Sequence, residues 1–109
     1  MTTITFFETE EGTFKAVECK GHAGFADYGN DIVCSAISVL TINTINSIQS
    51  FTKDEILISQ DEDKGLIRFD FKDIPSDEAN LLLRSYALGV RGIFEEYGKK
   101  FLNIKIRRV

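Results

Sequence analysis

The chain has 109 residues, of which 43% are hydrophobic and 28% charged, the balance of an ordinary globular protein. This length predicts one domain over residues 1–109, long enough to bury a core without disulfide or metal staples. The net charge of −4 gives no general attraction to phosphates, so direct nucleic acid binding is not expected.

The N-terminal residues lack the charged start and the apolar run of a signal peptide. No stretch approaches the roughly 18 apolar residues that a membrane span needs. We therefore expect a cytoplasmic protein with no membrane partner. The two cysteines, Cys19 and Cys34, are expected to be free thiols in a reducing compartment.

The first part of the chain predicts a β-hairpin followed by a loop. Ile4 and Phe6 begin an alternating strand, residues 10–12 turn the chain, and residues 14–20 run back. The segment 21–31 holds three glycines and breaks both the strand and the helix periodicity, which predicts a loop.

A long helix is predicted over residues 32–51, because apolar side chains recur there at steps of three and four. Asp31 stands directly before this run and is the expected N-cap. Ile42 and Ile45 widen the apolar stripe, so we expect a well-buried helix.

The second half of the chain predicts another hairpin, a helix and a last strand. Residues 55–60 and 67–72 alternate as strands. Ser76 is placed to cap a second helix, and Gly98 suits the position just past its end. Residues 102–106 form the last strand. The order β-β-α-β-β-α-β predicts an α+β domain with two helices on a mostly antiparallel sheet.

Cys34 and His22 are the candidate catalytic pair. If Asp31 caps the helix, Cys34 is its third residue, near unpaired N–H groups and the positive end of the dipole, which favour the thiolate. His22 is the only histidine and begins the same loop. Its imidazole could take the proton of the thiol and later protonate a leaving amine.

Two neighbours of this pair have alternative roles. Asp31 could orient His22, as in a catalytic triad, or spend its carboxylate on capping the helix. Ser38, one turn after Cys34, could donate a hydrogen bond near the sulfur or bond back to a helix carbonyl. Backbone N–H groups at the start of the helix, including that of Cys34, are candidates for the oxyanion hole. If Asp31 caps those groups, the hole is expected elsewhere, in the glycine loop.

Other interpretations stay open on spacing alone. Cys34 could be a small buried hydrophobe and His22 an ordinary loop residue. Cys19, His22 and Cys34 could bind zinc with Asp27 or Asp31 as a fourth ligand. Cys19 could be the resolving thiol of a redox protein. A non-catalytic RNA- or protein-binding module is the alternative to an enzyme.

Two segments resemble the signature of the ribosomal-processing cysteine protease family: Gly-His-Ala-Gly-Phe-Ala at 21–26 and Gly-Asn-Asp-Ile-Val-Cys-Ser-Ala-Ile-Ser at 29–38. The resemblance implies a homodimeric protease that needs no cofactor or metal. It implies removal of a short N-terminal extension from a large-subunit ribosomal protein, the twenty-seventh in the standard naming. His22 and Cys34 fall on the catalytic positions of the family. The same link to ribosomal proteins leaves open a non-catalytic ribosome-assembly factor as the alternative to an enzyme.

The loop itself is expected to meet the substrate. Gly21, Gly24 and Gly29 would let it move and admit an extended peptide. Phe25 and Tyr28 are candidates for contacts with substrate side chains, or else they anchor the closed loop to the core.

Overall fold

The computed structural model describes residues 1–21, 28–98 and 100–109, with residues 28–31 described by their backbone only. The elements follow the predicted order β-β-α-β-β-α-β. In chain order they are β1 (Thr2–Glu8), β2 (Phe14–Gly21), α1 (Tyr28–Phe51), β3 (Ile56–Asp61), β4 (Leu66–Phe71), α2 (Asp77–Tyr97) and β5 (Leu102–Arg108).

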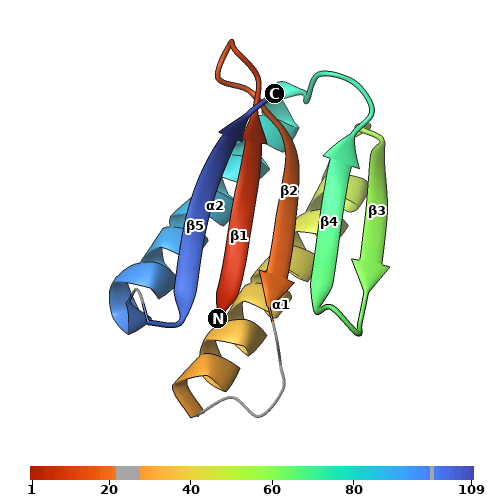
Figure 1. Cartoon of the computed structure of the whole chain (residues 1–109). Helices are drawn as coiled ribbons and strands as arrows, with labels where there is room; N and C mark the ends of the chain where they lie inside the picture. The colour runs from red at the N-terminus through yellow and green to blue at the C-terminus, as the bar shows by residue number, and fades with distance from the viewer. Residues whose placement is uncertain (22–27, 99) are drawn as a thin grey trace.

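The five strands form one sheet in the order β3-β4-β2-β1-β5. Its neighbours pair antiparallel, except that β1 and β5 run parallel. Both helices lie behind the sheet in Figure 1, so they cover one face of it. The predicted class, two helices on a mostly antiparallel sheet, is therefore confirmed.

The core lies between this face and the helices. Ile4 pairs with Cys19, and Phe6 pairs with Val17, so successive inward positions of β1 and β2 meet in register. All four side chains are buried. Facing them are buried residues of α1 and α2, among them Val33, Ile37, Ile48, Leu83, Tyr86 and Val90. The two helices therefore stand side by side on the central strands.

The start of α1 differs from the prediction. The helix begins at Tyr28, not at residue 32, so Asp31 is its fourth residue and not its N-cap. Ile45 is buried as expected, but Ile42 is 44% exposed and Phe51 is 76% exposed. The helix is thus buried along one stripe and carries an apolar outer surface as well.

This outer surface also changes the expectation about membranes. By length and composition alone, Ile32–Phe51 of α1 could cross a membrane. The expectation that no stretch reaches this size was therefore wrong. Length and apolar composition alone do not identify a membrane span, because the core helix of a soluble protein can have both.

The ends of α2 are those predicted. The Ser76 hydroxyl accepts a hydrogen bond from the N–H of Ala79 at 3.1 Å, which identifies Ser76 as the N-cap. Asp54 in turn accepts bonds from the N–H of Ser76, at 2.8 Å, and from its hydroxyl. At the other end Gly98 has a φ of 80°, and its N–H donates to the carbonyl of Phe94 at 2.7 Å. Local cap chemistry fixes both ends of this helix.

Candidate active site

The predicted site residues fall around the junction between β2 and α1. His22, Gly24, Phe25 and Asp27 lie outside the described residues, in the segment 22–27. The remaining candidates sit in regular structure, so residue 21 and residues 28–31 of the predicted loop belong to β2 and α1.

Tyr28 and Gly29 belong to the first turn of α1, so placing them in the loop was wrong. The expected helix start was late because glycine and asparagine at positions 29 and 30 are poor helix formers. The structure describes Tyr28 and Asp31 by their backbone only, so the contacts of their side chains remain predictions.

Cys34 is the seventh residue of α1, not the third. Its N–H therefore lies beyond the first four, which have no partner within a helix, and donates to the carbonyl four residues back. The suggestion that this N–H forms an oxyanion hole is wrong for that reason. The dipole effect fades within the first turn, so it acts on Cys34 less directly than predicted.

The direction of helical side chains nevertheless keeps the thiol near the start of α1. A side chain on a helix leans toward the N-terminus and covers the turn that precedes its own Cα. The N–H groups of residues 28–30, at the start of this helix, have no intrahelical partner. Cys34 is half-buried, and Ser38 lies one turn further along the same side. A partly exposed thiol beside free N–H groups has the setting of a reactive cysteine.

Gly21 is fixed in place and does not act as a hinge. It is the buried last residue of β2, and its N–H donates to the carbonyl of Gly65 at 3.0 Å. A Cβ on Gly65 would lie 1.7 Å from the carbonyl oxygen of Gly21. A Cβ on Gly21 would lie 2.6 Å from the hydroxyl of Thr2. Placing Gly21 in a mobile loop was therefore wrong: these close contacts hold the backbone where it enters position 22.

Cys19 has the opposite environment to Cys34. It is buried, with its sulfur 3.0 Å from the Tyr86 hydroxyl and 3.3 Å from the Thr41 hydroxyl. Burial raises the pKa of the Cys19 thiol, so it stays protonated at neutral pH. A protonated, buried thiol is a poor nucleophile and a poor resolving thiol. The alternation along β2 indicated that Cys19 points inward, but the pattern gave no sign of its two partners.

The zinc interpretation has no support among the residues that the structure describes. Among the side chains described, those of residues 1–21, 32–98 and 100–109, no three of His, Cys, Asp or Glu gather to hold a metal ion. The sulfur of Cys19 is engaged with hydroxyl groups instead.

An open apolar groove lies between α1 and α2. It encloses about 630 Å³. Its lining consists of Ser35, Ala36, Val39, Leu40, Asn43, Gly89 and Ile93. Val39 is 69% exposed, so this groove is an apolar surface available to a partner.

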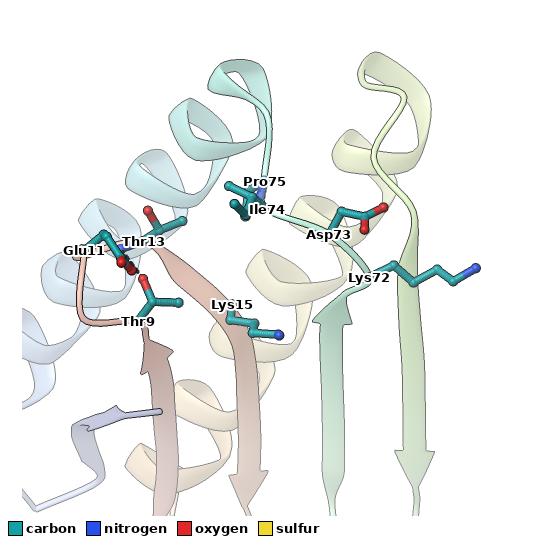
Figure 2. Close-up of a pocket in the computed structure, with 8 residues that line it drawn as sticks. All are labelled: Thr9, Glu11, Thr13, Lys15, Lys72, Asp73, Ile74 and Pro75. Atoms are coloured by element: carbon teal, nitrogen blue, oxygen red, sulfur yellow. Dashed lines mark hydrogen bonds between the residues drawn. The ribbon is translucent and has the colours of Figure 1, made fainter.

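A second hollow lies at the other end of the sheet, where β2 begins (Figure 2). It encloses about 500 Å³ and is lined by the turn before β2 and the segment after β4. Lys72 extends away from Thr9 and Thr13 in Figure 2, and its ammonium contacts Glu55 at 3.0 Å. The length of β2 separates this hollow from Gly21, so it does not take part in the candidate site.

Comparison with known proteins gives one consistent result. The model of the cysteine protease Prp family matches residues 1–102. A protein of Staphylococcus aureus described as ribosomal processing cysteine protease Prp is 32% identical over 106 residues, covering 96% of this chain and 100% of that protein. A crystal structure of Prp from S. aureus with a substrate peptide has a TM-score of 0.87 at 29% identity and covers 100% of both chains. Another, with a covalently linked product peptide, has a TM-score of 0.86 at 29% identity, covering 98% of this chain and 100% of that one.

Proposed function

Because the chain belongs to the cysteine protease Prp family and is a cysteine protease, we propose that it removes the N-terminal extension of a large-subunit ribosomal protein, the twenty-seventh in the standard naming. The relatives are described as ribosomal processing enzymes, and S. aureus Prp has been seen with substrate and product peptides. The protease domain in this proposal is the whole of residues 1–109.

The contrast between the two cysteines is the observation that carries the catalytic assignment. Cys34 is half-buried at the start of α1, whereas Cys19 is buried and hydrogen-bonded on two sides. A nucleophile must form a thiolate and reach a peptide carbonyl. Only the surroundings of Cys34 suit both needs, so we assign the nucleophile to Cys34 and the base to His22.

In the proposed reaction, the imidazole of His22 takes the proton of Cys34, and the thiolate attacks the scissile carbonyl carbon. A C–S bond forms as the C–N bond breaks, and the imidazolium gives its proton to the leaving amine. Water, activated by the same imidazole, then hydrolyses the acyl-enzyme and restores the thiol. The N–H groups of residues 28–30, which have no partner within the helix, are the proposed oxyanion donors, because the side chain of Cys34 leans toward that end of α1. No metal or cofactor is needed for these steps.

Supporting roles are proposed for neighbours of the pair. Since Asp31 is not the N-cap, its carboxylate is free of that role, which favours its orienting His22. Ser38 lies on the same side of α1 as Cys34, where its hydroxyl would donate toward the sulfur. We also propose that Phe25 and Tyr28 contact the substrate, with Gly24 and Gly29 providing the room that an extended peptide needs.

We further propose that the protein is a cytoplasmic homodimer, as the family resemblance implies. The groove between α1 and α2 supports a helix-mediated contact, because Val39, Ile42 and Leu88 are exposed apolar side chains on these two helices. Pairing of two copies through this surface would cover apolar area that one copy leaves in water.

A cleavage assay tests the proposed activity. The substrate is the ribosomal protein with its N-terminal extension, incubated with wild type, Cys34→Ala, His22→Ala and Asn46→Ala. Asn46 is an exposed residue of α1, so it controls for substitution in that helix. We expect wild type and Asn46→Ala to cut at one site near the end of the extension. Cys34→Ala and His22→Ala should be folded by circular dichroism and inactive.

Two results would contradict the assignment. Cleavage by folded Cys34→Ala at the wild-type rate would remove Cys34 as the nucleophile. A folded wild type that leaves the extension intact, although Cys34 reacts with a thiol reagent, would show that the substrate is a different protein.

A further inference from the structure

A buried polar cluster joins the two elements that carry the candidate catalytic pair. It consists of Cys19 on β2, Thr41 on α1 and Tyr86 on α2, and their exposures are 5%, 0% and 1%. The Tyr86 hydroxyl lies 3.0 Å from the Cys19 sulfur and 2.8 Å from the Thr41 hydroxyl. Polar side chains buried in a mostly apolar core cost stability unless they are hydrogen-bonded, as these three are to one another.

The number of hydrogens fixes the direction of the bonds. The Thr41 hydroxyl donates its single hydrogen to the carbonyl of Ile37 at 2.7 Å. Toward Tyr86, Thr41 can therefore only accept, so the Tyr86 hydroxyl donates to Thr41. With both hydroxyl hydrogens used in this way, neither hydroxyl can donate to Cys19, so the Cys19 thiol is the donor. Its sulfur is nearer to the Tyr86 hydroxyl, at 3.0 Å, than to the Thr41 hydroxyl, at 3.3 Å. The result is a directed chain that runs from Cys19 through Tyr86 and Thr41 to Ile37. Burial raises the pKa of Cys19 and keeps the proton that this chain requires.

The ends of this chain lie close to the catalytic pair along the sequence. Cys19 precedes His22 by three positions on β2, and Gly21 between them is held against Gly65. Thr41 follows Cys34 by seven positions, which is about two helical turns, so both lie on the same side of α1. Ile37 lies between them on that side. The chain thus ties the strand that leads to His22 to the helix that carries Cys34.

We propose that Cys19, Thr41 and Tyr86 are positioning residues that hold α1 in one rotation and register against β2, and that the proposed reaction of Cys34 requires this placement of the helix. Apolar contacts between a helix and a sheet are not directional, and they tolerate a small rotation or slide of the helix. Hydrogen bonds at 2.7–3.0 Å do not, because they weaken steeply when their geometry changes. A shift of about 1 Å between reacting groups can cost on the order of a hundredfold in rate.

Thr41→Val tests this proposal, which rests on the proposed Cys34–His22 mechanism. Valine has the shape of threonine but lacks the hydroxyl, so the chain breaks in its middle. We expect kcat to fall by about 10- to 100-fold while KM stays within about twofold. The pH profile of Cys34 alkylation by iodoacetamide, followed by peptide mass spectrometry, should shift to higher pH, because the thiolate loses its imidazolium. Thr41→Ser should restore both.

Thr44→Val is the matched control. Thr44 is also a buried threonine of α1, and its hydroxyl donates to the carbonyl of Leu40 at 2.9 Å. That bond stays within the helix and joins no other element. A purely structural role for Thr41 would lower the melting temperature of Thr41→Val more than that of Thr44→Val, because buried Tyr86 loses a partner, but it would leave kcat and the alkylation profile unchanged in both variants. Wild-type kcat and alkylation profile in folded Thr41→Val would overturn the proposal.

Tyr86→Phe keeps the proposal testable if Thr41→Val does not fold, since it removes only the hydroxyl. The cleavage assay and the alkylation profile also test the proposed substrate and the positioning role separately. If wild type does not cleave but Thr41→Val still shifts the alkylation profile relative to Thr44→Val, the proposed substrate is wrong and the positioning role stands. If wild type cleaves and both Thr41→Val and Tyr86→Phe match it in both readings, the positioning role is wrong and the protease assignment stands.

Discussion

The two ends of the sheet are held together by different kinds of interaction. At the end where β2 begins, the contacts involve charged groups. The carboxylate of Asp54 accepts hydrogen bonds from Ser76, and Lys72 forms an ion pair with Glu55. Where β2 finishes, uncharged contacts dominate, namely the backbone of Gly21 against Gly65 and, two residues earlier, the hydrogen bonds of Cys19. The candidate site lies at this second end.

This difference means that the two ends respond to different changes. Charged contacts at the surface are adjustable, because water and salt can replace them and pH can remove them. Glycine contacts and buried neutral hydrogen bonds are rigid, and they are lost only through a change of shape or a strongly alkaline pH. The site is thus supported by parts whose strength does not depend on pH near neutrality.

The strongest way to break the rigid end is Gly65→Ala. Its Cβ would lie 1.7 Å from the Gly21 carbonyl oxygen, and its φ of +60° disfavours a side chain in any case. We expect the free energy of unfolding to fall on the order of 3–5 kcal/mol, measured by urea denaturation.

Gly92→Ala is the control for that substitution. Gly92 lies in α2, and a Cβ there meets no atom within 4 Å. This variant should gain about 0.5–1 kcal/mol, because alanine favours a helix. Equal effects of the two substitutions would show that the contact between Gly21 and Gly65 has no role in stability.

Alkaline pH should have the second-largest effect, by weakening the hydrogen bonds of Cys19 near the end of β2. Burial raises the pKa of Cys19 above its ordinary value of 9.0, so the unfolded chain loses this proton before the folded chain does. The associated stability is complete below pH 9 and is lost as the pH rises toward the folded pKa. Urea denaturation should show that the free energy of unfolding falls less between pH 7.5 and 9.5 in Cys19→Ser than in wild type, since serine does not titrate. Identical losses would mean that the Cys19 thiol is free to ionise in the folded protein.

Acid should have the smallest effect, and only at the charged end. Burial opposes ionisation of Asp54, but hydrogen bonds from Ser76 outweigh it and hold the pKa of Asp54 below its ordinary value of 3.8. The stability it contributes is present above pH 4 and is lost as the pH falls through the folded pKa. In thermal denaturation, Asp54→Asn should be less stable than wild type at pH 5, and the difference should narrow by pH 3. A constant difference would rule out this linkage.

Local chemistry predicted the parts of the fold that depend on neighbouring residues. Ser76 and Gly98 marked the ends of α2 correctly, because a cap is made within one turn of the helix. The start of α1 was missed, since Gly29 and Asn30 disfavour a helix that nevertheless forms there. The strand order could not be predicted, because it depends on pairing between residues far apart in the chain.

In the candidate site, too, the features set by neighbouring residues could be predicted, and those set by contacts between distant residues could not. The motif around Cys34 was visible in the sequence, and the alternation of β2 indicated an inward Cys19. Thr41 lies four residues after Ile37 on the inward stripe, so the helical spacing could have identified it as buried. Its meeting with Tyr86 on a different helix depends on tertiary packing, which no local pattern encodes.

The parallel pairing of β1 with β5 has a consequence for the order of assembly during synthesis. Thr2 lies opposite Leu102, and Glu8 lies opposite Arg108, so β1 acquires this neighbour only after almost all of residues 1–109 have been made. Contacts between such distant parts of a chain form slowly, because a long loop must close first. A ribosome translating this chain would hold an incomplete sheet, with one side of β1 unpaired, until β5 emerges from the exit tunnel.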